Sequence, residues 1–515
     1  MAREDAPEYF DVIVVGAGIS GIGAGHYLQK NCPQKSFAIL ENRENIGGTW
    51  DLFRYPGIRS DSDMFTLGFA FKPWTEQEAI ADGPSILNYL EETAREENLF
   101  EKIRFRHKVV GASWSSAEAR WTVEIERGET GEAVHYQCNF LFMCTGYYRY
   151  EAGYTPEWEG MADYGGTLIH PQHWPENLDY RGKKVVVIGS GATAVTLVPA
   201  MLEGEEAAGH VVMLQRSPTY MVSRPGMDRL ANRLRSFLPS KLAYAITRWK
   251  NVLLQQFIFR RARSRPDKVK EFLLNHVRDE LGPDYDIETH FTPRYNPWEQ
   301  RLCLVPDSDF FRVLRDGTAS VATGQIDRFT GTGILLESGE EIEADIIVTA
   351  TGLDLQMAGG IDAWVDGEKI NFGDKVTYKA MMFDDVPNFA ISFGYTNASW
   401  TLRADLTCDY VCRLLNHMDA TRTEIAVPRL PEDEEIERLP WVDFSSGYFK
   451  RAEHKLPKQG DRGVWKNLQN YPKDIFALKF GKIADEAMVF EKRRPAEAKP
   501  AGEEAPEAPE AIAAE

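Results

Sequence analysis

A glycine-spaced turn near the start of the chain constrains its fold most. The β-branched run at residues 11–15 is typical of a buried parallel strand, and Gly16, Gly18 and Gly21 follow it at once. This spacing suits a tight turn, a close approach of the backbone to a pyrophosphate, and close packing of a helix on the strand. The free N–H groups at the start of that helix would face the phosphates. The pattern therefore predicts the first half of a dinucleotide-binding domain.

An acid at the end of the next strand extends this pattern. The strand predicted at residues 36–40 ends in Glu41, about 20 residues after the glycines, where a carboxylate accepts hydrogen bonds from a ribose hydroxyl pair. A glycine pattern alone is a weak signal. Strand, glycines, helix, strand and acid in this order favour a dinucleotide site over an ordinary glycine-rich turn.

The same pattern starts again in the middle of the chain. A strand at residues 183–188 is followed by GSGATA at 189–194, a helix at 195–202 and a strand at 210–214. This last strand ends in Gln215, Arg216 and Ser217 instead of an acid. A guanidinium and a hydroxyl suit a 2′-phosphate, which favours NADP(H) over NAD(H). The alternative is an ordinary surface arginine after a strand.

Two further strands, at residues 140–144 and 345–348, are each followed by a Thr-Gly turn. Two such endings after two glycine turns predict an α/β fold with two nested Rossmann-like dinucleotide-binding domains and a helical insertion. We also expect a helix at 84–97, a strand at 388–394 and a helix at 399–416. Residues 103–110, 120–126 and 133–138 should form an antiparallel meander. The expected division is a first domain from 1–155 and 351–494, a linker at 156–182, a second domain at 183–350 with its insertion at about 222–300, and a disordered acidic tail at 495–515.

Composition limits the classes of function. With 515 residues the chain can form several domains, and its net charge of −19 makes nucleic acid an unfavourable partner. The first residues carry no apolar core or cleavage signal, and no uncharged apolar run outside the glycine-rich start reaches the roughly 18 residues of a spanning helix, so we expect a cytoplasmic protein. The six cysteines have neither CxxC nor metal-ligand spacing, which predicts reduced, mostly buried thiols and no metal.

A basic segment stands out in this acidic chain. Residues 229–270 contain twelve Lys or Arg and one acid, with aromatic residues between them. One interpretation is a helical insertion that walls the substrate entrance and exposes a solvated basic face. The other is peripheral docking on anionic lipid at the inner membrane surface, which would deliver apolar substrates.

Between the two glycine turns the chain resembles a known family. Residues 164–175, YGGTLIHPQHWP, resemble the FxGxxxHxxxW(P/D) fingerprint of Baeyer–Villiger monooxygenases, with Tyr164 as the one departure. Residues 47–61 match that family's [AG]GxW…[FY]PG…D pattern. Segments such as YPGIRSDSDM and HPQHWPE resemble the branch that contains the mycobacterial ethionamide-activating monooxygenase and putative long-chain-alkane monooxygenases.

The resemblance implies FAD on the first glycine turn and NADPH on the second. The FAD contacts carried over by this match are Gly16, Gly18, Ser20, Gly21, Glu41, Thr49, Trp50, Asp51, Asp61 and Val109. The NADP(H) contacts are Arg59, Ser60 and Asp61 near the nicotinamide, Gly189, Ser190, Gly191, Ala192, Thr193, Ala194 and Val195 at the pyrophosphate, and Arg216 and Ser217 at the 2′-phosphate. Gln300 stands where the family often has a basic residue, which removes one expected phosphate contact.

The resemblance also implies an NADPH- and O₂-dependent enzyme. Its flavin C4a-peroxide would convert ketones, including aliphatic and long-chain ones, to esters or lactones, and would also oxidise sulfides. Arg301 would stabilise the peroxide and the tetrahedral adduct, and Asp61 would pair with Arg301 during flavin reduction. Without the motif, Arg301 would be read as part of a surface salt bridge. A role in alkane degradation is the alternative, but such a peroxide lacks the driving force for an unactivated C–H bond, so a derived ketone is the better substrate.

Two residues of these motifs have competing interpretations. His170 lies in the fingerprint, and we favour a hinge that couples NADP binding to domain movement over proton transfer. Trp50 could stack near the flavin or pack its own loop. The helix predicted after residues 397–400 could direct N–H groups at the flavin C2 carbonyl.

Two other classes of protein share part of this pattern. A flavin disulfide reductase shares the architecture, and Cys408 and Cys412 fall on one face of a predicted helix, but no reductase motif surrounds them. A non-enzymatic lipid-surface or scaffolding protein is disfavoured because both cofactor motifs are complete. The exact substrate and the oligomeric state stay open.

Overall fold

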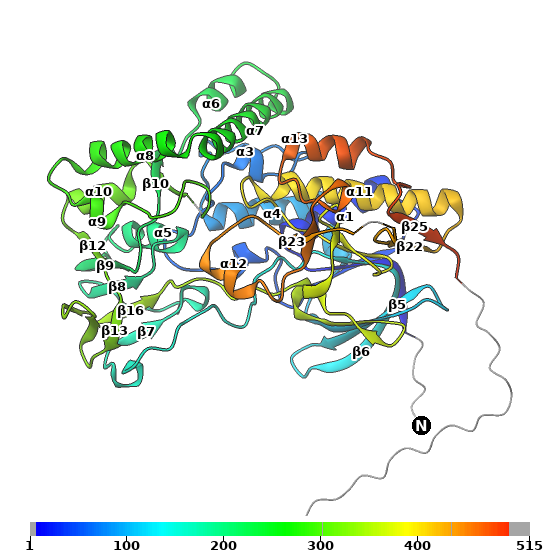
Figure 1. Ribbon diagram of the computed structural model, residues 1–515, viewed down its shortest axis with the longest axis horizontal. Helices are drawn as coiled ribbons and strands as arrows, with labels where there is room; N and C mark the ends of the chain where they lie inside the picture. The colour runs from blue at the N-terminus through cyan, green and yellow to red at the C-terminus, as the bar shows by residue number, and fades with distance from the viewer. Residues whose placement is uncertain (1–6, 301, 434, 494–515) are drawn as a thin grey trace, which may run out of the picture.

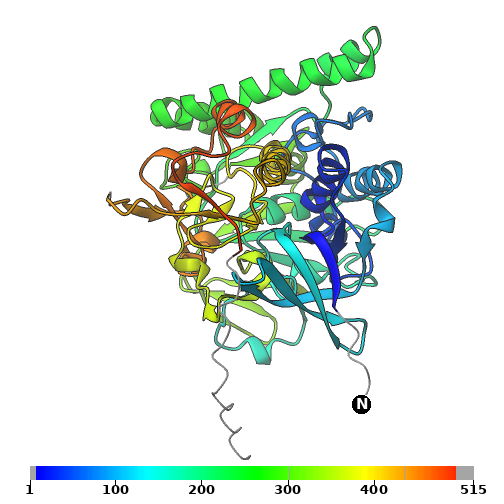
Figure 2. The same ribbon diagram turned by 90° about the vertical axis from the view of Figure 1, so that its right-hand side faces the viewer.

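The computed structural model describes residues 7–300, 302–433 and 435–493. Two α/β units lie beside each other, and the insertion helices extend along one outer edge of the molecule (Figures 1 and 2). Each unit contains a parallel sheet that begins with a strand, a glycine turn and a helix. The expected fold class is therefore confirmed.

The first unit is built on a nine-stranded sheet. Its order is β18-β17-β4-β5-β6-β1-β2-β3, with β21 paired to β6. The strands are β1 (Glu8–Val15), β2 (Phe37–Leu40), β3 (Ile103–Arg104), β4 (His107–Ser115), β5 (Arg120–Arg127), β6 (Glu132–Met143), β17 (Asp362–Val365), β18 (Glu368–Lys369) and β21 (Phe389–Ile391). Along β1, Val12 and Val14 join the core beneath α1 (Ile19–Asn31), whereas Ile13 and Val15 join the core on the other face. Burial on both faces explains why this strand reads as a continuous apolar run.

The meander departs from the expected strand boundaries in two places. The separate strands expected at 133–138 and 140–144 are one strand, β6, because its first half pairs with β5, its second half pairs with β1, and residues 136–138 pair with both. The strand expected at 103–110 is split into β3 and β4. Arg106 between them has φ +56°, a left-handed conformation that ends the extended chain.

The second unit contains a five-stranded parallel sheet of order β12-β9-β8-β16-β7. Its strands are β7 (Thr167–Ile169), β8 (Lys184–Ile188), β9 (His210–Gln215), β12 (Ala319–Thr323) and β16 (Ile346–Thr349), with α5 (Ala192–Ala200) and α10 (Asp309–Arg315) packed nearby. Strand β7 comes from the fingerprint segment itself. A small antiparallel sheet of β13 (Ile326–Phe329), β14 (Gly333–Leu336) and β15 (Glu341–Glu343) precedes β16.

The helical insertion leaves and re-enters the second unit through a short parallel pair. Strand β10 (Met221–Arg224) pairs with β11 (Cys303–Pro306). Between them lie α6 (Arg229–Arg235), α7 (Ser240–Ser264), α8 (Pro266–Leu281) and α9 (Ile287–His290). Among the described residues, no helix combines the length and apolarity needed to cross a bilayer.

The chain then returns to the first unit. Helix α11 (Trp400–Thr421) packs against α1, and β21 completes the sheet beside β6. The remaining elements here include α2 (Thr49–Leu52), α3 (Met64–Leu67), α4 (Gly83–Glu96), α12 (Gly447–Ala452), α13 (Tyr471–Asp474), β19 (Thr377–Tyr378), β20 (Met382–Phe383), β22 (Ile425–Pro428), β23 (Arg438–Pro440), β24 (Lys458–Gly460) and β25 (Met488–Glu491). The helices expected at 84–97 and 399–416 are thus confirmed as α4 and α11. The tail predicted at 495–515 lies outside the described residues.

All six cysteines are within the described residues, and each is buried as a free thiol. Cys408 and Cys412 lie inside α11, and Cys32, directly after α1, donates from its Sγ to the carbonyl oxygen of Cys412 at 3.5 Å. Burial raises the pKa of Cys408, which disfavours the thiolate that disulfide chemistry requires. The packing therefore gives no support to the disulfide-reductase alternative.

Candidate functional site

One cavity of about 860 Å³ runs along both glycine turns. It lies at the carboxyl ends of β1 and β8, the edge at which open α/β sheets bind ligands. Its volume is in the upper part of the roughly 300–1,000 Å³ typical of small-molecule sites. The two Thr-Gly turns, residues 145–146 and 351–352, also line it. The chain thus brings two distant sequence repeats to a single space.

The first turn has room for backbone but not for side chains. Gly16 has φ +101°, and a Cβ atom there would lie 2.7 Å from the carbonyl oxygen of Cys144. A Cβ atom on Gly21 would lie 1.8 Å from the carbonyl oxygen of Gly16, so α1 packs directly on the turn. No side chain caps the first turn of α1, which leaves its N–H groups for a ligand. These features fit a dinucleotide pyrophosphate at Gly16 and Gly18.

Glu41 lies at the end of β2, where it lines the cavity and is buried. Its Oε2 accepts a hydrogen bond from the Ala17 backbone N–H at 2.7 Å, and its Oε1 accepts one from the Arg43 N–H at 2.9 Å. Burial raises the pKa of this carboxyl, while the two N–H bonds act in the opposite direction. A carboxylate has about four acceptor positions. One therefore holds the glycine turn through Ala17, one holds the loop after Glu41 through Arg43, and the others suit a hydroxyl pair.

The second glycine turn repeats this geometry, and a hydrogen bond joins it to the segment that carries Arg216. Gly189 has φ +138°, and a Cβ atom there would lie 2.3 Å from the carbonyl oxygen of Ala350. Gly191 precedes α5 with no side-chain cap, and the space beside it is open. Ser190 Oγ donates to the carbonyl oxygen of Ser217 at 3.1 Å. This bond fixes the turn beside Arg216, which is exposed and lines the cavity.

A second arginine, which the sequence did not reveal, reaches the same region from α12. The guanidinium of Arg451 stacks on Tyr154 with its carbon 3.6 Å from the ring centroid, and both residues line the cavity. Burial lowers the pKa of Arg451, and repulsion from Arg216 acts in the same direction, so the two cations are near each other. An arginine keeps its charge at neutral pH despite such a shift.

Known proteins are similar to this chain over almost its whole length. Residues 74–279 match the model of the flavin-binding monooxygenase-like family, and residues 14–79 match an NAD(P)-binding Rossmann-like domain. The FAD-containing monooxygenase EthA of Mycobacterium tuberculosis is 52% identical over 486 residues, which cover 94% of this chain and 98% of that protein. The chain belongs to the EthA-like flavoprotein monooxygenase family. The resemblance inferred from the motifs is thereby confirmed.

Another sequence relative and two solved structures are also similar to this monooxygenase. The probable FAD-binding monooxygenase AlmA of Acinetobacter baylyi is 49% identical over 486 residues, which cover 94% of this chain and 97% of that protein. The fold is similar to that of a steroid monooxygenase bound to NADP, with a TM-score of 0.74 and 22% identity over 94% of this chain and all of that one. A cyclohexanone monooxygenase in its closed form gives 0.73 and 20%, over 95% of this chain and all of that one.

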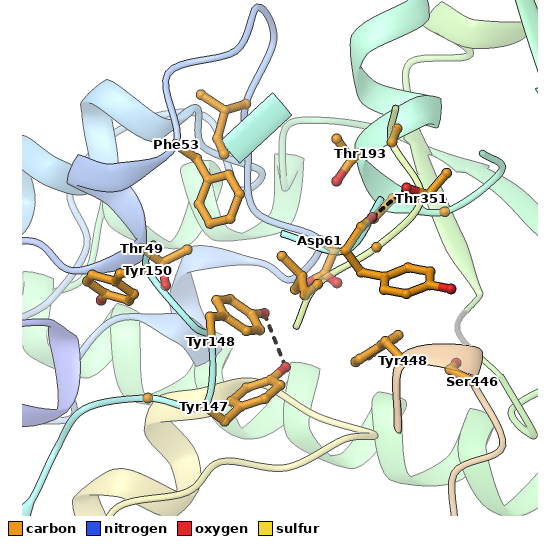
Figure 3. A pocket seen from close by; sticks show the side chains of 18 of the residues that line it. Thr49, Phe53, Asp61, Tyr147, Tyr148, Tyr150, Thr193, Thr351, Ser446 and Tyr448 are labelled. Atoms are coloured by element: carbon orange, nitrogen blue, oxygen red, sulfur yellow. Dashed lines mark hydrogen bonds between the residues drawn. The ribbon is translucent and has the colours of Figure 1, made fainter. Parts of the chain in front are cut away.

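Most residues predicted for the cofactors do border the cavity of the monooxygenase. The predicted residues that line it are Gly16, Gly18, Ser20, Glu41, Thr49, Trp50, Arg59, Ser60, Asp61, Val109, Gly189, Ser190, Gly191, Ala192, Thr193, Arg216 and Ser217. Thr49, Asp61 and Thr193 face the same space in Figure 3. Ser20 also accepts a hydrogen bond from Trp400 Nε1 at 2.8 Å, which links α1 to the start of α11.

Four predicted contact residues are not among those lining the cavity. Gly21, Ala194 and Val195 are buried in their helices, where they allow the helix to pack on the sheet. Asp51 is also buried, and its carboxylate forms ion pairs with Arg43 at 2.7 Å and with Arg54. The structure thus gives Asp51 a role in holding its own loop. Trp50 lines the cavity and packs on the core at once, so both of its interpretations hold in part.

The residues predicted to lie near the nicotinamide, Arg59 and Ser60, are held in position by contacts within the protein. Arg59 Nη1 pairs with Asp309 Oδ2 at 2.5 Å, while its buried Nη2 has no hydrogen-bond partner within the described part of the chain. That free donor borders the cavity and fits a polar ligand group. Ser60 Oγ donates to the carbonyl oxygen of Ser62 at 2.7 Å.

Arg301 lies outside the described residues, so its predicted pairing with Asp61 stays a prediction. The chain on either side of it, at Gln300 and Cys303, lines the cavity.

Aromatic side chains that sequence patterns did not single out form much of the wall. Tyr147 and Tyr148 follow β6 and their hydroxyls are 3.1 Å apart, and Phe53 contacts Tyr148 edge to face (Figure 3). Trp400 stacks on Tyr147 with an interplanar angle of 12°. The one available signal was the run Tyr147-Tyr148 directly after the Thr-Gly turn. These rings add apolar surface to the wall of the cavity.

Proposed function

We propose that the chain is an FAD-containing, NADPH- and O₂-dependent monooxygenase that inserts oxygen next to the carbonyl of aliphatic ketones and gives esters or lactones. The observation that carries this proposal is a single cavity bordered by two glycine turns, one followed by an acid and the other by an arginine. Bound FAD would supply the ring that accepts hydride from NADPH and activates O₂. The names of EthA and of the NADP-bound steroid monooxygenase support both cofactors.

Residues of the chain would hold the two cofactors in order. Glu41 would accept the ribose hydroxyls of FAD while it holds the first turn. Arg216 and Arg451 would clamp the 2′-phosphate of NADPH between two guanidinium groups. Arg451 would then replace the contact that Gln300 lacks. The rings of Tyr147, Tyr148 and Trp400 would limit water beside the reacting atoms.

His170 is better suited to positioning than to proton transfer. Its Nδ1 accepts a hydrogen bond from the Gln172 N–H at 3.2 Å, so the proton on Nε2 faces the carbonyl oxygen of Gly352 at 3.3 Å. Burial lowers the pKa of His170, which keeps the ring neutral. The ring therefore joins the fingerprint segment to the second Thr-Gly turn. This arrangement supports the hinge interpretation.

The two arginines beside the second glycine turn, Arg216 and Arg451, can be tested by substitution. We expect Arg216→Gln to lower kcat/KM for NADPH by about 10- to 100-fold and to leave that for NADH nearly unchanged, because a charge-assisted phosphate contact contributes about 1.5–3 kcal/mol. Arg451→Gln should shift the same ratio in the same direction, with partial recovery in Arg451→Lys. Steady-state kinetics with both nucleotides measures the effect.

A matched control for both arginines is Arg312→Gln, which removes an exposed cation that pairs with Glu203 at 2.7 Å. It should leave kcat/KM for NADPH and kcat/KM for NADH unchanged. If Arg216→Gln loses activity equally with NADPH and NADH, the assignment of the 2′-phosphate is wrong.

The proposed reaction is tested with a panel of 2-ketones of increasing chain length. We expect the purified protein to be yellow and to form ester in proportion to the NADPH consumed. A matching panel of alkanes should give no oxygenated product. Alkane hydroxylation without ketone oxidation would favour the alkane alternative, and a colourless protein that FAD cannot reconstitute would remove the proposal.

A further inference from the structure

Helix α7 exposes large apolar side chains to solvent and buries several polar ones. Its inner face is mixed, with Thr247, Arg248 and Asn251 buried beside apolar residues such as Val252. Its exposed residues include Leu253 and Phe257, whose side chains are 58% and 66% accessible. A helix on a water-exposed surface normally turns its apolar stripe inward. The outward apolar stripe therefore needs an explanation outside the fold of one chain.

Hydrogen bonds on the inner face fix this orientation. Arg248 Nη1 donates to the carbonyl oxygens of Phe65 at 2.9 Å and Gly68 at 2.7 Å. Asn251 Nδ2 donates to Asp63 Oδ1 at 2.8 Å, and the same carboxylate caps α3. These buried donors would lose their partners if the helix rotated, which is unfavourable for polar groups removed from water. The apolar stripe is thus held outward.

The exposed apolar residues lie on α7 and on segments next to it, and we call this set the α7 face. On α7 they recur at three- and four-residue intervals and so share one side of the helix. Phe237 after α6, Phe272 of α8, and Phe476 and Phe480 beyond α13 extend the surface. Both views place α6, α7 and α13 along the same outer edge (Figures 1 and 2). The α7 residues are Leu242, Ile246, Trp249, Leu253, Leu254 and Phe257.

Exposed cations lie on the same insertion helices as these apolar residues. No ion pair is recorded, within the residues that the structure describes, for any of six exposed cations. They are Arg229, Arg233, Lys241, Arg260, Arg265 and Lys268. The whole chain carries a charge of −19, so this is a local excess of the opposite sign. Aromatic and aliphatic side chains with flanking Arg and Lys are the composition of a helix that lies in an anionic bilayer interface.

We propose that the α7 face docks on the surface of an anionic lipid bilayer. A second copy of the chain is a poorer occupant, because a two-fold interface would place this basic surface against itself. The rings of Trp249 and Tyr471 are 6.0 Å apart, and those of Tyr471 and Tyr395 are 6.4 Å apart. Tyr395 lines the cavity. Docking would therefore bring lipid-dissolved molecules close to the cavity wall.

Vesicle sedimentation of the full-length holoenzyme tests this proposal. We expect binding to phosphatidylglycerol vesicles, at least about tenfold weaker binding to phosphatidylcholine vesicles, and a fall at high salt, because Lys and Arg attract anionic lipid over about a Debye length. Trp249→Ser combined with Phe257→Ser should lower binding at least about tenfold. Arg229→Gln, Arg233→Gln and Lys241→Gln together should remove the preference for anionic lipid.

The matched control is Phe100→Ser, which removes an exposed aromatic side chain from the short helix η1 (Leu99–Glu101). It should bind vesicles as the unaltered chain does. Flavin content and melting temperature of each variant show that the fold is kept. Equal recovery in the supernatant with and without anionic vesicles would overturn the proposal. So would a Trp249→Ser, Phe257→Ser variant that dissociates an oligomer in sedimentation velocity but binds vesicles normally, since a second copy would then cover the face.

Discussion

Arg301→Ala is expected to lower the rate of ketone oxygenation by about 10²–10³-fold, the usual cost of removing one preorganised charge that stabilises a developing anion. NADPH should still be oxidised, because hydride transfer does not need that charge, so consumption of NADPH and formation of ester should become uncoupled. Arg301→Lys should recover only part of the rate, since a lysine lacks the fixed planar fork of an arginine.

Ester yield, NADPH loss and hydrogen peroxide release in the same reaction measure this uncoupling. Arg315→Ala is a suitable control, because Arg315 is a half-exposed arginine that pairs with Glu280 at 2.8 Å. It should keep the coupled reaction. Undiminished ester formation by Arg301→Ala would remove Arg301 from the mechanism while leaving the cofactor assignments intact.

Gly16→Val is expected to abolish FAD binding. Gly16 has φ +101°, where a β-branched residue is strongly strained, and its Cβ atom would meet the Cys144 carbonyl oxygen at 2.7 Å. Either the turn opens or β6 moves away from β1, and both displace the N–H groups at the start of α1. Flavin absorbance per mole of protein, before and after incubation with excess FAD, measures the loss.

The control for Gly16 separates strain from site geometry. Gly204 has φ +83° with nothing within 4 Å of its Cβ position. Gly204→Ala should therefore cost about 1–2 kcal/mol of stability from the left-handed conformation alone, and should keep full flavin content. Gly16→Ala at full FAD stoichiometry would show that this turn tolerates a side chain and would contradict the predicted site.

Local signals predicted much of the cofactor site. Strand, glycine turn and helix lie within about 25 residues of one another in each repeat, so their spacing alone encodes the geometry around Gly16 and Gly189. Arg216 was likewise predictable, because it occupies the position after β9 where the first repeat has Glu41. These expectations depend on neighbours in sequence, and the structure places these residues on one cavity.

Contacts between segments that are distant in the chain could not be predicted from such local sequence patterns. Arg451 reaches the cavity from α12, and only the folded chain brings it to Tyr154. Asp51 belongs to a recognisable motif, but its burial beneath Arg43 depends on how the loop folds back. The outward position of the large apolar side chains of α7 could not be predicted either. Its apolar residues have ordinary helical spacing, and only the position of the helix reveals which side meets water.

The nested topology has a consequence for biosynthesis. Strand β21 and helix α11, which complete the first sheet and cover α1, follow the entire second unit in the chain. A ribosome that adds about 5–20 residues per second therefore leaves the apolar surface of α1 uncovered for tens of seconds after β1 has emerged. During that interval we expect the nascent chain to need chaperones or early flavin capture, and truncations before residue 400 should accumulate as insoluble protein.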